Sequence, residues 1–140
     1  MPKPPHFFQA YPFSCVPACI RMVLASLEFE ITEVALRELC NCEDDGTTLS
    51  DAISGLKQLG YNKSTIDYLD IIELQEKLSA GFYPIVFLRL INGENHAVVV
   101  TGIFRTAIKI LDPAIGEREF ERQEFIKIWA VSNGKTLLIE

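Results

Sequence analysis

The spacing of apolar residues divides this chain into a helical first half and a strand-rich second half. After a proline-rich arm over residues 1–10, apolar positions recur every three or four residues, which is typical of one face of a helix. These positions are Ile20, Val23, Leu24 and Leu27. Pro17 suits the start of this helix, because its missing N–H would have no partner there. The pattern predicts a first helix that begins near Pro17.

Polar capping residues predict three more helices before residue 82. Thr32 and Asp70 each precede an amphipathic stretch, and Thr48-Leu49-Ser50-Asp51 has the pattern of a capping box. Gly60 and Gly81 follow two of these stretches, as glycines often do after a helix end. The three helices are expected over residues 33–39, 49–59 and 71–79.

The residues after 82 are rich in β-branched and aromatic side chains, which favour strands. Short polar turns such as Asn92-Gly93 separate them, as in antiparallel hairpins. The expected strands cover residues 83–91, 96–104, 107–111 and 135–139, and a short helix covers 122–129. Helices followed by a strand meander indicate an α+β fold, in which the N-terminal helices pack against a C-terminal antiparallel β-sheet. We expect a single domain over residues 1–140, with the first helix starting at the cleft between its two halves.

Length and charge narrow the classes of function. The chain has 140 residues, of which 49% are hydrophobic, so it can bury a core of its own. It has 13 Lys and Arg against 19 Asp and Glu, a net charge of −6. Since nucleic-acid binding depends on clustered basic side chains, no nucleic-acid partner is expected.

The terminal and apolar segments indicate a cytoplasmic protein without a membrane span. The prolines of the N-terminal arm are incompatible with the apolar helix of a signal peptide. The longest apolar stretch, 83–91, contains Arg89 and is too short to cross a bilayer. Thiols stay reduced in the cytoplasm, so the four cysteines are expected to be catalytic, metal-binding or buried rather than paired in disulfides.

Cys15 is the candidate nucleophile, because it lies two residues before the predicted first helix. Free N–H groups and the positive end of the helix dipole stabilise a negatively charged sulfur at that place. Thiol catalysis also needs a histidine as base and donors for the oxyanion. A free cysteine can equally be a small buried apolar residue, so its position alone leaves both interpretations open.

His96 and Asp112 can complete a catalytic set. His96 is one of only two histidines, and it follows a polar turn at the mouth of a strand. Asp112 ends the next strand and precedes Pro113, so both residues should lie at the same end of neighbouring antiparallel strands. An acidic residue there can orient the imidazole and stabilise its charged form. Taken singly, a turn histidine and an Asp-Pro turn need no such role.

Gln9 lies six residues before Cys15. Its side-chain amide, together with the backbone N–H of Cys15, could bind the oxyanion of a tetrahedral intermediate. A glutamine followed six residues later by a helix-opening cysteine resembles the papain-like cysteine peptidases.

Further motifs resemble one branch of those enzymes, the bacteriocin-processing peptidases that cut leader peptides after a double glycine. The similar segments are Ser14-Cys15-Val16-Pro17-Ala18-Cys19-Ile20-Arg21-Met22, Gly46-Thr47-Thr48-Leu49, Asn95-His96-Ala97-Val98-Val99-Val100 and Leu111-Asp112-Pro113-Ala114-Ile115-Gly116. The resemblance implies a papain-like fold and the catalytic triad Cys15, His96 and Asp112, with Gln9 as oxyanion donor. It implies no cofactor and no metal.

The same resemblance implies a peptide or protein substrate. Members of this family are often the N-terminal domains of peptide-exporting ABC transporters, so a separate peptide exporter is an expected partner of a stand-alone relative. Two residues depart from the usual pattern, since Ser14 stands in place of aspartate and Val16 in place of glycine. Glycine lets a substrate approach the backbone closely, so Val16 should narrow the site or change its preference.

Three other interpretations stay open at this point. Cys15, Cys19, Cys40 and Cys42 could form a four-thiolate zinc site, although neither pair has the usual two intervening residues. The chain could be a peptide-binding domain with the peptidase fold and no proteolytic activity. It could also be a thiol acyltransferase or amidohydrolase for a non-peptide substrate, since a fold and a triad do not determine the acyl donor.

Overall fold

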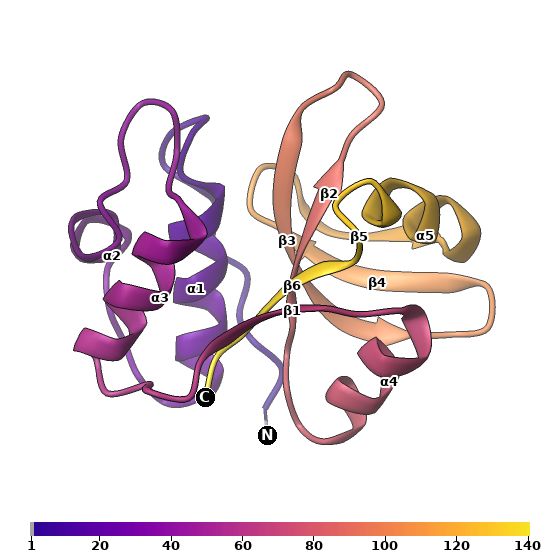
Figure 1. Cartoon of the computed structure of the whole chain (residues 1–140), viewed down its shortest axis with the longest axis horizontal. Coiled ribbons are helices and arrows are strands. Elements are labelled where there is room, and N and C mark those ends of the chain that lie inside the picture. Colours follow the sequence, from indigo (N-terminus) through magenta and orange to yellow (C-terminus); the bar gives the residue numbers. More distant parts are fainter. Residues whose placement is uncertain (1) are drawn as a thin grey trace.

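The computed structural model describes residues 2–140, in which a group of helices lies beside a six-stranded sheet (Figure 1). The helices α1, α2 and α3 lie together, and we call them the helical side. The sheet, with α4 and α5 packed on its far face, is the sheet side (Figure 1). The helices are α1 (Cys15–Ser26), α2 (Glu33–Leu39), α3 (Leu49–Gln58), α4 (Ile71–Ser79) and α5 (Arg122–Ala130).

All neighbouring strands of the sheet are antiparallel, in the order β1-β6-β2-β3-β4-β5. The strands are β1 (Thr65–Tyr68), β2 (Ile85–Arg89), β3 (Asn95–Ile103), β4 (Ala107–Asp112), β5 (Gly116–Glu121) and β6 (Lys135–Leu138). Strands β2 to β5 form a meander, and β6 lies between β1 and β2. The predicted α+β fold, with N-terminal helices against a C-terminal antiparallel sheet, is confirmed.

The alternation of side chains along β3 supplies two hydrophobic cores. Ala97 and Val99 belong to the core that α1, α2 and α3 share with the sheet. Val98 and Val100 belong to the core beneath α4 and α5. Successive side chains of a strand point to opposite faces, so a buried central strand must be apolar at every position. This burial holds β3 firmly between two layers and fixes the place of its first residues.

Helix α1 begins two residues earlier than predicted, at Cys15 instead of Pro17. Ser14 is its N-cap residue, and the Ser14 carbonyl accepts the first helical hydrogen bond from Ala18 N–H at 3.1 Å. Pro17 is thus the third residue of the helix. It is tolerated there because the N–H groups of the whole first turn have no partner within the helix.

Two short strands were not predicted. β1 has only four residues and pairs with β6 at one edge of the sheet. β5 has the sequence Gly-Glu-Arg-Glu-Phe-Glu and pairs with β4 at the other edge. Charged residues rarely indicate strands, but at an edge every second side chain can reach solvent.

The capping box expected at Thr48 is only half present. Thr48 Oγ1 accepts a hydrogen bond from Asp51 N–H at 3.1 Å, whereas the Asp51 carboxylate accepts one from Asn41 Nδ2 at 3.3 Å. A complete capping box occurs instead at the start of α4, between Asp70 and Glu73. None of the helices within residues 2–140 has the length and apolar character needed to cross a membrane.

Candidate active site

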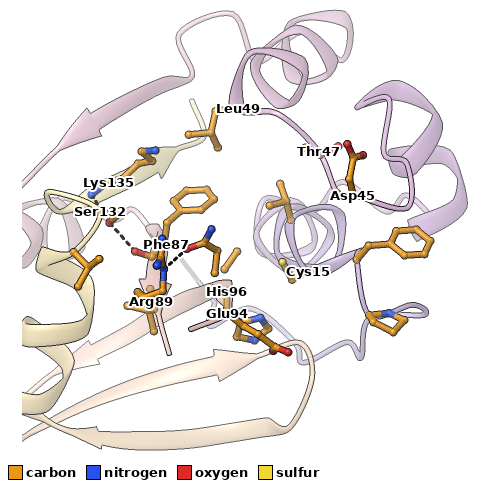
Figure 2. Close-up of a pocket in the computed structure, with 18 of the residues that line it drawn as sticks. Cys15, Asp45, Thr47, Leu49, Phe87, Arg89, Glu94, His96, Ser132 and Lys135 are labelled. Atoms are coloured by element: carbon orange, nitrogen blue, oxygen red, sulfur yellow. Dashed lines mark hydrogen bonds between the residues drawn. The ribbon is translucent and has the colours of Figure 1, made fainter. Parts of the chain in front are cut away.

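A cleft of about 680 Å³ lies between the helical side and the sheet side, with Cys15 and His96 among its lining residues (Figure 2). From the N-terminal segment and the helical side it is lined by Pro12, Phe13, Cys15, Val16, Asp44, Asp45, Gly46, Thr47 and Leu49. From the sheet side it is lined by Phe87, Leu88, Arg89, Glu94, Asn95, His96, Ala97, Val131, Ser132 and Lys135. The cleft is therefore shared between segments that are distant in the sequence.

Cys15 is the first residue of α1, and its side chain is partly exposed toward this cleft. The free N–H groups of a helix start lie around its sulfur and favour a negative charge there. Cys19, one helical turn later, is fully buried and donates its S–H to the Ala97 carbonyl at 3.4 Å. Burial, followed by the nearby Cys15 and Asp112, raises the pKa of Cys19 well above its ordinary value. Of the two cysteines on α1, only Cys15 is placed to react with a molecule in the cleft.

His96, the second residue of β3, donates its Nε2 proton to Asp112 Oδ1 over 2.7 Å. This bond leaves Nδ1 as the ring nitrogen available to Cys15. Burial of the ring disfavours its charged form. The hydrogen bonds with Asp112 and Cys15 and the charges of these two groups outweigh burial, and they raise the pKa of His96 from 6.5 to about 9.

Asp112, the last residue of β4, is almost fully buried, and its carboxylate is held on several sides. Besides His96, Ala114 N–H donates to Oδ1 at 2.9 Å and Arg118 Nη1 donates to Oδ2 at 3.3 Å. Burial alone would raise the pKa of Asp112. The hydrogen bonds from His96 and Ala114, with the charges of His96 and Arg118, lower it below its ordinary value instead. Asp112 is thus held as an anion beside the imidazole.

Gln9 lies close to this strand end but outside the group of residues that line the cleft. Its backbone N–H donates to the Pro113 carbonyl at 2.8 Å, and its Nε2 donates to the Tyr11 carbonyl at 2.8 Å. The second Nε2 proton is left for another acceptor. Gln9 Oε1 is buried and accepts no hydrogen bond from any atom of residues 2–140.

Two neighbours of Asp112 had no predicted role. His6 Nε2 lies 2.7 Å from the Asp112 backbone carbonyl, and Arg118 pairs with its carboxylate. Arg118 lies on β5, which the sequence pattern did not reveal. A signal was nevertheless present, because a turn from Pro113 to Gly116 returns the chain alongside β4 and sets Arg118 beside Asp112.

The four cysteines do not form a metal site. Within the part of the chain that the structure describes, no three or more His, Cys, Asp or Glu side chains are grouped so that they could hold a metal ion. Cys40 is buried, and burial, with Cys42 and Asp51 nearby, raises its pKa to about 11. Because these side chains form no such group, the zinc interpretation has no support in the geometry of the described residues.

Comparison with known proteins yields one family. The chain matches the model of the Peptidase C39 family over residues 4–140. A lacticin-481/lactococcin-DR transport/processing ATP-binding protein of Lactococcus lactis subsp. lactis is 29% identical over 117 residues, which cover 81% of this chain and 16% of that protein. The chain thus spans about a sixth of the length of this relative.

Solved structures share the fold. The peptidase domain of Streptococcus ComA, a bifunctional ABC transporter involved in quorum sensing, superposes with a TM-score of 0.79 at 22% identity, over 96% of each chain. A double-glycine motif protease from an AMS/PCAT transporter, solved with its leader peptide, gives a TM-score of 0.77 at 22% identity over 99% of this chain and 93% of that one. The predicted papain-like fold is confirmed, and since the family model covers nearly every residue, this chain belongs to the Peptidase C39 family.

Proposed function

We propose that this protein is a cysteine peptidase in which Cys15 is the nucleophile, His96 the general base and Asp112 the residue that orients His96. One observation carries the proposal. Cys15 lies at the start of α1 and His96, bonded to Asp112, lies across from it in the same cleft (Figure 2). Membership of the family supports the same reaction class.

In the proposed first step the proton of Cys15 passes to His96 and the sulfur attacks the scissile carbonyl carbon. A pKa of about 9 keeps the proton on the His96 ring at neutral pH, and the Asp112 carboxylate balances its charge. The imidazolium then gives its proton to the leaving amine as the C–N bond breaks. Water, deprotonated by His96, attacks the thioester and releases the acid and the free thiol.

The oxyanion needs donors that are already in place. The N–H of Cys15 is one candidate, because the first residue of a helix has no intrahelical partner for it. The uncommitted Nε2 proton of Gln9 is the other. The backbone N–H of Gln9 is hydrogen-bonded to the carbonyl of Pro113, the residue after Asp112. The same turn of the chain therefore positions both the proposed oxyanion donor and Asp112.

For the substrate we propose a leader peptide cut after Gly-Gly in the cytoplasm, with a peptide exporter as the partner that receives the product. The proposal comes from the relatives, one named for transport and processing and one solved with a leader peptide. Val16 lines the cleft next to Cys15 and is 7% exposed. Its side chain limits the space beside the nucleophile, which favours residues as small as glycine at the scissile bond. Residues 1–140 would act as one domain.

A peptide-library digest analysed by mass spectrometry tests both the proposed mechanism and the proposed Gly-Gly specificity. Wild-type protein should cleave peptides with a Gly-Gly preference, and Cys15→Ala should cleave none. Cys42→Ala is the matched control, because Cys42 is also a partly exposed free thiol, two residues before the cleft-lining Asp44, and its replacement should leave cleavage intact. Equal cleavage by wild type and Cys15→Ala would refute the mechanism. Peptide binding without cleavage would indicate a binding domain, and cleavage without a Gly-Gly preference would overturn only the specificity.

A further inference from the structure

We propose that Glu33 is a positioning residue that holds the segment from Gln9 to Cys15 in the shape that oxyanion binding needs. The inference rests on the proposed function, since it concerns the oxyanion donors of that reaction. Glu33 is the first residue of α2 and is only 6% exposed. It does not line the cleft, so it would act through other residues.

The Glu33 carboxylate reaches across to the N-terminal segment. Its Oε1 accepts hydrogen bonds from Ala10 N–H at 2.9 Å and from Ser14 Oγ at 3.2 Å. Its Oε2 accepts one from Arg37 Nε at 3.1 Å. A buried carboxylate is costly unless it is paired and hydrogen-bonded. Here two of its three partners come from the segment between Gln9 and Cys15.

The Ser14 hydroxyl is directed to Glu33 by the bonding at Tyr11. The Tyr11 carbonyl already accepts the Gln9 Nε2 proton at 2.8 Å and Ser14 N–H at 3.1 Å, which occupy its two lone pairs. Ser14 Oγ lies 3.0 Å from this carbonyl and 3.2 Å from Glu33 Oε1. Since the carbonyl already accepts two hydrogen bonds and the carboxylate is the stronger, charged acceptor, we assign the hydroxyl proton to Glu33, while Ser14 Oγ accepts Tyr11 N–H at 3.1 Å. A continuous chain of hydrogen bonds thus runs from Glu33 through Ser14 and Tyr11 to the Gln9 amide.

Arg37 contacts the side chains of the same segment. Its guanidinium, paired with Glu33, lies 4.7 Å from the centre of the Tyr11 ring. Tyr11 stacks on Phe13 with ring centres 5.1 Å apart, and Phe13 lines the cleft. The ion pair therefore contacts the segment through both its backbone and its rings.

Residues 9–14 need such support because they form neither helix nor strand. A bend and a turn leave them without the repeated hydrogen bonds of regular structure, yet an oxyanion donor must be held to within about half an ångström. A carboxylate at a helix start can simply favour the helix dipole. That role does not require bonds to residues 19 and 23 positions earlier in the chain, which Glu33 makes.

The test compares two reactions of the same sulfur. Acylation of Cys15 by p-nitrophenyl acetate passes through an oxyanion and releases p-nitrophenolate, whereas alkylation by iodoacetamide displaces iodide without forming one. We expect Glu33→Gln to lower the ratio of the two rates about tenfold, because loss of a whole oxyanion donor costs about a hundredfold or more. Glu38→Gln, an exposed glutamate on the same helix, is the matched control and should leave it unchanged.

Ser14→Ala provides a second variant, because it removes the hydroxyl link and leaves the pair of Glu33 with Arg37. It should lower the ratio in the same direction. An unchanged ratio in both variants would overturn the inference. Failure of the proposed function would be seen separately, in wild-type protein: if Cys15 is alkylated no faster than Cys42 at pH 6, Cys15 is not an activated nucleophile and the role of Glu33 falls with it.

Discussion

The helical side of the cleft presents Cys15 through one local feature, the first turn of α1, whereas the sheet side presents His96 through contacts that cross three strands. Cys15 itself lies at a helix start, beside its free N–H groups. His96 on β3 depends on Asp112 at the end of β4, which in turn depends on Arg118 of β5. The nucleophile is thus positioned by short-range structure and the base by strand pairing.

This difference has a consequence for how variants should behave. Changes on the sheet side pass through ionisable groups, so their effects should depend on pH. Changes on the helical side alter donor geometry, so their effects should depend little on pH.

Replacement of the base should give the largest loss. His96→Gln keeps a polar side chain of similar reach but cannot take the proton of Cys15 at neutral pH. We expect kcat/KM to fall at least about a thousandfold, as for other members of a catalytic set. Peptide cleavage by purified variant and wild type measures this loss. A residual rate within tenfold of wild type would remove His96 from the mechanism.

The raised pKa of His96 predicts that folding stability falls in the alkaline range. The charged ring contributes fully below its unfolded pKa of 6.5, and this contribution is lost as pH rises through about 9. The loss should be about 3 kcal/mol, since one pKa unit corresponds to about 1.4 kcal/mol. Urea unfolding of the wild type at pH 6 and pH 9.5 measures this loss. The same measurement on His96→Gln gives the change due to lysines and tyrosines, which is subtracted. The same pH dependence in both proteins would contradict the prediction.

Loss of the Gln9 amide should lower kcat about a hundredfold with little change in KM, because an oxyanion donor acts mainly in the transition state. In contrast to variants of the sheet side, Gln9→Ala should keep the pH profile of the wild type. Gln75→Ala, on exposed surface of α4, is the control. A loss smaller than about fivefold would show that Gln9 is not a donor in the reaction.

Removal of Arg118 should have the smallest effect and the clearest dependence on pH. Its charge helps to lower the pKa of Asp112, so in Arg118→Met this pKa rises and activity disappears at a higher pH on the acid side. At neutral pH the loss should be about fivefold, which corresponds to about 1 kcal/mol for a partly exposed ion pair. Profiles of kcat/KM from pH 4 to 8 measure both changes, with exposed Arg105→Met as control. If kcat/KM of Arg118→Met fell at the same acid pH as that of the wild type, Arg118 would have no influence on Asp112 and, through it, on His96.

The helices and the central strand meander could be predicted from the sequence, because local residue patterns determine each of them. The stripe from Ile20 to Leu27 and the caps Thr32 and Asp70 act within a few residues, and they predicted the helices to within about two positions. The places of His96 and Asp112 at one end of two neighbouring strands followed from turn residues on either side of those strands. Strand β5 could not be predicted in the same way, because its charged residues give no local strand signal and the strand forms by pairing with β4.

The residues that surround the site could not be predicted from the sequence for a related reason. Glu33, Arg118 and His6 show no pattern in the sequence that differs from ordinary surface charge. Glu33 and His6 contact partners 19 and 106 positions away, and Arg118 contacts Asp112 across the turn between β4 and β5. A carboxylate becomes a buried anchor only when folding brings Ala10 and Ser14 to it.

By itself, the sequence determined the elements, the order in which they occur and the residue types able to carry thiol chemistry, because helix caps, turns and apolar periodicity act over short distances. Only the tertiary structure decided that Cys15 and His96 share a cleft, that Asp112 is held by Arg118 and Ala114, and that Gln9 is linked to Glu33. Such contacts depend on which buried surfaces pack together, and that choice is made by the whole core rather than by any segment of it.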